Sequence, residues 1–191
     1  SLVTSKHQMV KGSFAGSDWD QKSYESYVKR TRDKLSLMER EPIKIKPGNY
    51  RTWFESAAVS DFINMFSWNG ISEASLRQGC SGFGRMRHDD IRLSPKFSIV
   101  EDFRPGFCPK FNSDGEVPSD ELVLIEDGRL KNTLISSRSA KEYGLESNFA
   151  ENGEYLRSPN MKSGSLNQND VLKTINNGLY LSNIHYLNWS D

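Results

Sequence analysis

Three histidines, two cysteines and a few acidic pairs are the residues of this 191-residue chain best suited to chemistry. The histidines are His7, His88 and His185, so no two of them lie four or five positions apart. A zinc site needs three or four nitrogen, sulfur or oxygen ligands, and a helical zinc motif takes two of them from histidines at that spacing. A His-Glu-x-x-His or His-Glu-x-x-x-His helix is therefore excluded, because residues 8–87 contain no histidine.

One polar cluster is left as an alternative site. His88 is followed directly by Asp89 and Asp90, and with His185 these side chains could supply metal ligands or a general base for an unusual peptidase. Adjacent polar residues in a loop are more often a solvated turn. We therefore expect no catalytic, metal-binding or cofactor-binding residue in this chain.

Two other motifs have simple structural interpretations. The glycine-rich run 79–84 lacks the Lys-Ser/Thr pair of a phosphate-binding loop, and no clear helix follows it, so we expect a surface loop. Asp114 and Glu116 could form a pair of catalytic carboxylates. However, Asp-Gly followed closely by Pro118 is typical of a turn, which is the interpretation we favour.

Composition excludes several classes of protein. The 25 basic residues balance the 25 acidic ones, whereas domains that bind nucleic acid usually carry a basic excess, so we expect no nucleic-acid partner. The longest apolar runs have about four residues, far fewer than the roughly 20 that span a membrane. Residues 1–10 lack a signal-peptide core. Because Cys80 and Cys108 form no Cys-x-x-Cys pair, we expect free thiols and a cytoplasmic location.

The spacing of apolar residues predicts an α+β fold, an antiparallel sheet with hairpins and a few packed helices. A helical segment over 1–45 should lead into a domain over 46–191. Helices are expected over 20–38, 56–68, 72–78, 139–143 and 170–176, and strands over 50–54, 97–100, 121–126, 129–135 and 179–189, with a polar loop over 157–170. Asp127-Gly128 is a strong hairpin signal, and Phe62, Ile63 and Phe66 should face the core.

Several segments, taken in order, resemble the C-terminal domain of the TldD/PmbA (TldD/TldE) proteins, also known as modulators of DNA gyrase. Each motif alone is weak, but their order along the chain makes the resemblance strong. The segment 111–118 has Asn112 and Asp114 where the family usually has Asp and Glu. The resemblance implies that the chain is a fragment of that domain, incomplete at its C-terminus. The matching segments are 48–55 with the helix that follows, 97–102, 111–118, 124–130, 134–144 and 178–183.

The resemblance implies a two-subunit peptidase acting in proteolysis or peptide maturation. In the TldD-type subunit, a helix near the position of residues 55–69 carries His-Glu-x-x-x-His, and a later cysteine completes a zinc site. Residues 54–68 of this chain contain no histidine, so the chain resembles the PmbA/TldE type, which lacks the metal motif. The implied role is to form, with a TldD-like partner that holds the zinc, a chamber in which unfolded peptides are cut.

Other interpretations stay open at this point. The chain could associate with itself, act as a peptidase through the unusual site around His88, or work as a free-standing peptide-binding module.

Overall fold

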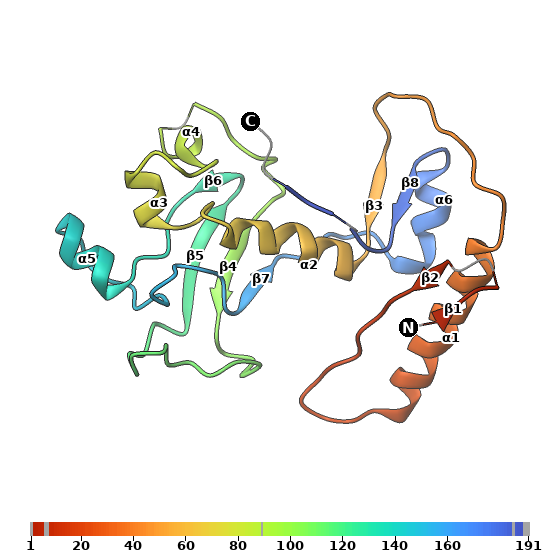
Figure 1. Cartoon of the computed structure of the whole chain (residues 1–191), viewed down its shortest axis with the longest axis horizontal. Coiled ribbons are helices and arrows are strands. Elements are labelled where there is room, and N and C mark those ends of the chain that lie inside the picture. The colour runs from red at the N-terminus through yellow and green to blue at the C-terminus, as the bar shows by residue number, and fades with distance from the viewer. Residues whose placement is uncertain (1, 6–7, 89, 185, 189–191) are drawn as a thin grey trace. The chain divides into compact units, whose positions relative to one another are not determined.

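The computed structural model of the chain describes residues 2–5, 8–88, 90–184 and 186–188 (Figure 1). The backbone divides into two compact units, Ser1–Tyr50 and Arg51–Asp191, and each is described here by itself. Among the helices in the described ranges, none combines the length and the hydrophobicity needed to cross a membrane.

The first unit is a small hairpin and one long helix. β1 (Leu2–Val3) pairs antiparallel with β2 (Met9–Val10), and α1 spans Gln21–Met38, close to the predicted bounds. The Asp20 carboxylate caps α1 by accepting a hydrogen bond from the N–H of Lys22 at 3.0 Å. No residue of α1 is buried. This unit therefore has little apolar core of its own.

A four-stranded antiparallel sheet in the order β6-β5-β4-β7 is the centre of the second unit. β4 is Ile99–Asp102, β5 is Glu121–Glu126, β6 is Arg129–Leu130 and β7 is Pro159–Met161. Asp127 and Gly128 both have positive φ, as the predicted hairpin turn requires. A side chain on Gly128 would also collide with the Leu93 carbonyl oxygen, 2.2 Å from an added Cβ. The predicted α+β fold is confirmed.

Short helices lie around this sheet, with α5 drawn apart from it at the edge of the view (Figure 1). α2 is Ser56–Asn64, continued by the 3-10 turn η1 (Met65–Ser67); α3 is Glu73–Arg77, α4 is Gly84–Arg87 and α5 is Ser137–Tyr143. Ile63 and Phe66 are buried as predicted, but Phe62 is 45% exposed, so the prediction that it faces the core is wrong. The core cluster comprises Ile63, Phe66, Ile71, Leu76, Phe83, Met86, Ile99, Leu124, Ile125, Leu134 and Ala150.

The end of the chain differs most from the sequence-based prediction. The strand expected over 179–189 is only three residues long, β8 (Leu179–Leu181), and it pairs in parallel with β3 (Thr52–Phe54). After β8 the chain is held by a side chain instead of a sheet partner, because the N–H of Ile184 donates to Asp61 at 3.2 Å. Residues 185 and 189–191 lie outside the described ranges.

The predicted loop over 157–170 also contains regular structure. It contributes β7 at the edge of the sheet and the 3-10 turn η2 (Gln168–Asp170), which leads into α6 (Val171–Ile175). Pro159 cannot donate a hydrogen bond to a neighbouring strand, so its run gives no strand signal, yet the sheet edge tolerates it.

Candidate functional site

The sequence-based alternative site can be followed only in part. His88 caps the C-terminal end of α4 and is exposed. Asp90 is also exposed, and its N–H donates to the Arg85 carbonyl oxygen at 3.0 Å. Asp89 and His185 lie outside the described residues. Across the ranges that the structure does describe, no group of three or more His, Cys, Asp or Glu side chains could hold a metal ion.

The acidic side chains of the helix on which the resemblance places a zinc motif form hydrogen bonds with the end of the chain. Glu55, directly before α2, accepts a hydrogen bond from the hydroxyl of Tyr180 on β8. Asp61 accepts from the N–H of Ile184. The carboxylates at the start and middle of this helix therefore hold β8 and the chain that follows it. With no histidine on the helix, its residues do not fit a zinc site.

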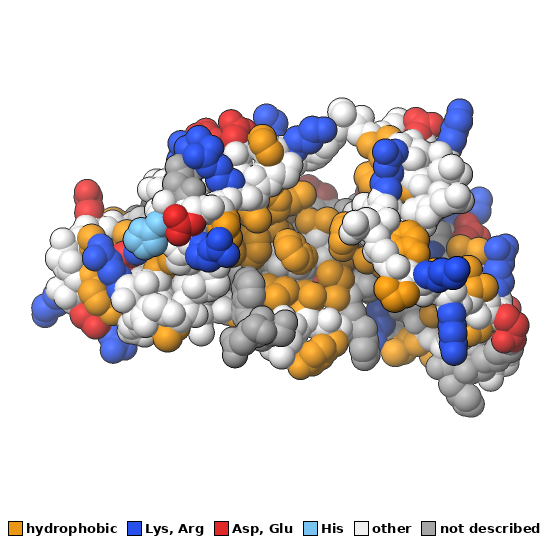
Figure 2. Space-filling model, turned by 90° about the horizontal axis from the view of Figure 1, so that it is seen from above, with side chains coloured by type: hydrophobic (Ala, Val, Ile, Leu, Met, Phe, Trp, Pro, Cys, Tyr) orange, Lys and Arg blue, Asp and Glu red, His pale blue; other side chains and the backbone are white. Residues whose placement is uncertain are grey.

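The same helix presents an apolar surface. Phe62 lies against the buried Phe66, with ring centroids 5.8 Å apart in an edge-to-face arrangement. Phe54 before the helix and Trp68 after it are each 42% exposed. Figure 2 shows hydrophobic side chains exposed on the face that it draws. We call Phe54, Phe62 and Trp68 the α2 surface. Large apolar side chains that stay exposed mark a contact surface where they form one continuous patch.

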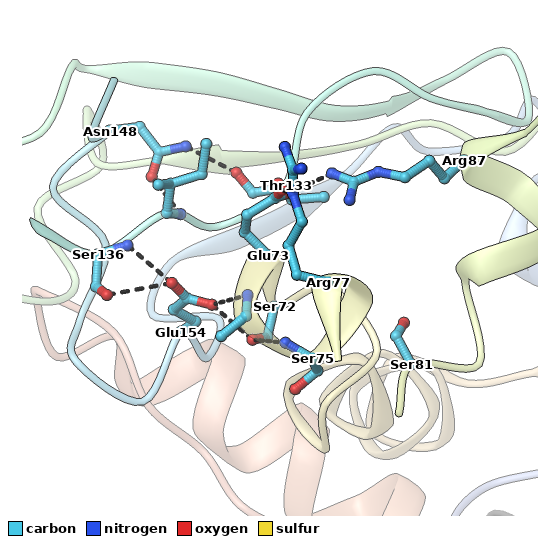
Figure 3. A network of polar contacts seen from close by, with 12 residues as sticks. Ser72, Glu73, Ser75, Arg77, Ser81, Arg87, Thr133, Ser136, Asn148 and Glu154 are labelled. Atoms are coloured by element: carbon cyan, nitrogen blue, oxygen red, sulfur yellow. Dashed lines mark hydrogen bonds and ion pairs between the residues drawn. The ribbon is translucent and has the colours of Figure 1, made fainter. Parts of the chain in front are cut away.

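In the interior of the second unit, the carboxylate of Glu154 contacts the N-termini of two helices, α3 and α5 (Figure 3). Its Oε2 accepts from the Ser72 hydroxyl at 2.5 Å and from the Ala74 N–H at 2.9 Å. Its Oε1 accepts from the N–H and the hydroxyl of Ser136 at 3.0 and 3.1 Å. Ser72 caps α3 and Ser136 caps α5, so Glu154, only 2% exposed, ties both caps together.

A second buried carboxylate, Glu73, lies next to this site on α3 (Figure 3). It accepts from Arg77 Nε at 2.8 Å and from the Thr133 hydroxyl at 2.6 Å, and it forms an ion pair with Arg87. Arg87 belongs to α4 and Thr133 to the segment after β6. Glu73 therefore joins three separate parts of the second unit.

Both carboxylates are held in the charged form. Burial alone would raise the pKa of Glu154, but the hydrogen bonds donated by Ser139, Ser72, Ser136 and Ala74 outweigh burial and lower it. Burial likewise opposes ionisation of Glu73, and the pKa is lowered by the hydrogen bonds from Arg87, Thr133 and Arg77. Each carboxylate is thus kept charged by the same donors that it joins, which suits a structural role.

Glu101 on β4 is the buried carboxylate with the opposite shift. Burial raises its pKa, although the N–H groups of Ser158 and Arg157 donate to it. It lines a cavity of about 20 Å³ together with Phe103, Leu134 and Arg157. A cavity of that volume holds about one water molecule and no peptide side chain. Glu101 is therefore out of reach of a substrate.

Sequence reasoning missed Glu73, Glu101 and Glu154. Ser72 and Ser136 each precede a helix, and a cap at those positions can be inferred from spacing. No sequence signal identifies Glu154 as their common acceptor, because Asn152-Gly153-Glu154 is typical of an exposed turn.

Comparison with known proteins identifies the larger unit. Residues 47–191 match the sequence family described as the PmbA/TldA metallopeptidase C-terminal domain. No match is found among curated proteins.

Three solved structures share the fold. A proposed modulator of a DNA gyrase from Thermotoga maritima has a TM-score of 0.69 and 19% identity over 85% of this chain and 38% of its own. A proposed modulator of DNA gyrase from Bacteroides thetaiotaomicron has a TM-score of 0.66 and 14% identity over 85% of this chain and 36% of its own. TldE from Thermococcus kodakarensis has a TM-score of 0.60 and 17% identity over 87% of this chain and 40% of its own. The chain thus spans between 36% and 40% of the length of these three proteins.

Proposed function

We propose that this chain, which belongs to the PmbA/TldA metallopeptidase family, is the metal-free subunit of a peptidase complex. In this proposal a TldD-like partner holds the zinc, and the complex cuts unfolded peptides in the cytoplasm. The chain binds neither nucleic acid nor membrane.

The observation that carries the proposal is the composition and use of α2. The TldD-type motif needs two histidines on this helix, and residues 8–87 have none. The two acidic side chains at this helix, Glu55 and Asp61, accept hydrogen bonds from Tyr180 and Ile184. A zinc ion would have to compete with both contacts and would still lack nitrogen ligands on this helix.

The α2 surface supports the second half of the proposal. Burying three large apolar side chains against another protein removes apolar area from water, at about 25 cal/mol per Å². One of the structures with this fold is named TldE, which is consistent with a subunit role. We therefore assign the α2 surface to the contact with the partner.

Co-purification tests this assignment. We expect the chain to elute together with the TldD-like protein of the same organism, and Phe62→Asp to weaken that association by at least about tenfold, since a charge would be buried at the contact. Lys141→Asp on α5 is the matched control, an exposed substitution away from the α2 surface, and should leave association unchanged. Elution of the unsubstituted chain without the TldD-like protein would favour the free-standing peptide-binding module.

A further inference from the structure

The sequence contains three Asn-Gly pairs, Asn69-Gly70, Asn152-Gly153 and Asn177-Gly178. In such a pair the backbone nitrogen of the glycine can attack the side-chain carbonyl carbon of the asparagine, because glycine has no Cβ to block the approach. The attack also needs a pair that water reaches and a glycine N–H that is not held in a hydrogen bond. The fold therefore decides which of the three pairs reacts.

Two of the pairs are protected by their surroundings. The N–H of Gly178, directly before β8, donates to the carbonyl oxygen of Ile175 at 2.8 Å. Gly70 is buried against the 3-10 turn η1, where an added Cβ would lie 3.0 Å from the carbonyl oxygen of Phe66. Neither glycine nitrogen reaches the preceding side chain unless a hydrogen bond or the core packing is first disrupted.

The third pair is open to solvent. Asn152 and Gly153 are both exposed and form the centre of a tight turn, in which the N–H of Glu154 donates to the carbonyl oxygen of Glu151 at 2.7 Å. Within the described ranges, the N–H of Gly153 donates to no backbone carbonyl. The Asn152 side chain is restrained by one contact, from its Nδ2 to Asp114 Oδ2 at 2.8 Å. Both partners are exposed, so water can replace this bond at little cost.

We propose that Asn152 is a site of deamidation. The Gly153 nitrogen forms a bond to Cγ of Asn152 and gives its proton to solvent, the bond from Cγ to Nδ2 breaks, and ammonia leaves. The product is a five-membered succinimide ring. Water then opens the ring at one of its two carbonyl groups, which yields either aspartate or isoaspartate at position 152. The reaction needs only water and releases only ammonia.

Both products disturb the hydrogen bonds of Glu154. Aspartate places a second carboxylate where the Asn152 amide donated to Asp114, so an attraction becomes a repulsion between like charges. Isoaspartate routes the main chain through Cγ and lengthens it by one carbon atom, two residues before Glu154. That carboxylate must reach Ser72 and Ser136 at the same time. Conversion of one exposed turn therefore weakens the contacts that join α3 and α5.

Peptide mapping of the aged chain tests the site. The purified chain is kept in mildly alkaline buffer, and mass spectrometry with an isoaspartate-specific assay follows the three Asn-Gly pairs over time. We expect Asn152 to convert at least about fivefold faster than Asn69 or Asn177, the factor that corresponds to opening one hydrogen bond. Equal rates at the three pairs, or faster conversion at either of the other two, would overturn the assignment to Asn152.

Urea unfolding of the separated products tests the consequence. Anion exchange resolves the converted chains, which carry one more negative charge, and they should unfold at a lower urea concentration than unconverted chains from the same sample. Asn152→Gln is the matched control, because its longer amide does not readily close the five-membered ring, and the same incubation should leave its midpoint unchanged. Identical midpoints for converted and unconverted chains, or an equal loss in the aged control, would refute the link to Glu154.

Discussion

The carboxylate of Glu154 accepts a hydrogen bond from the hydroxyl of Ser72, 82 positions earlier in the chain, at a distance of 2.5 Å. The same hydroxyl accepts from the N–H of Ser75 and so caps α3 at 3.1 Å. The hydroxyl and N–H groups that contact Glu154 all donate hydrogen bonds to its carboxylate. The fold of the second unit therefore depends on a buried side chain that can only accept.

Glu154→Gln should destabilise the protein. The amide places an N–H group against the donors of either Ala74 or Ser136, so buried donors lose their acceptor, at a cost of about 2 to 4 kcal/mol. Urea unfolding followed by circular dichroism measures the change. Glu146→Gln, on the exposed surface, is the matched control and should change the free energy of unfolding by less than about 0.5 kcal/mol. Equal effects of the two substitutions would show that the network contributes nothing.

Stability should fall in acid. The pKa values of Glu73 and Glu154 are lowered from 4.5 in the folded state, so their contribution is fully present above pH 4.5 and is lost as the pH falls through the folded pKa values. Glu101 acts in the opposite direction, because its raised pKa makes the folded state take up a proton more readily. Urea midpoints between pH 7 and pH 3 measure both effects.

Two variants separate these contributions to the pH dependence. Glu101→Gln keeps one acceptor oxygen for the N–H groups of Arg157 and Ser158. It removes the group whose protonation favours the folded state, so stability should fall more steeply as the pH decreases. Glu154→Gln removes one of the lowered groups, so the loss should become shallower. The opposite order of the two slopes would refute the assignment of these shifts.

Phe66 and Phe62 should differ sharply when each is replaced by Ala. Phe66 is 4% exposed and packs on Phe83 with ring centroids 4.8 Å apart, so its loss should cost roughly 3 to 5 kcal/mol. Phe62 is half exposed, and its loss should cost less than about 1 kcal/mol in the isolated chain. The pair forms its own control, since the same atoms are removed. Similar costs in a denaturant melt would mean that Phe62 is buried after all.

Local signals in the sequence predict much of this fold. The Asp127-Gly128 turn follows from two positions that need positive φ, and the predicted helix over 139–143 ends where Gly144 adopts the left-handed conformation. The periodicity over 20–38 predicts α1 within one residue. In each case the deciding interactions lie within a few positions of one another.

Interactions between distant segments could not be predicted in the same way. Thr52 pairs with Leu179, which lies near the other end of the second unit in the sequence, and no local signal such as a turn predicts that pairing. Phe62 fits the apolar stripe of α2 as well as Ile63 does, and only tertiary packing decides which of them is covered. The partners of Glu73 and Glu154 likewise come from segments far apart in the sequence, whose meeting depends on the complete fold.

Peptide cleavage by reconstituted subunits tests the central claim most directly. An unstructured peptide is incubated with this chain alone, with the TldD-like protein alone, and with their mixture, and zinc is measured in each purified sample. We predict that this chain alone shows no cleavage and no stoichiometric zinc, and that the mixture cleaves, with the zinc on the TldD-like protein. Cleavage by this chain alone, abolished by substituting His88 or His185, would contradict the account and establish the unusual-site peptidase in its place.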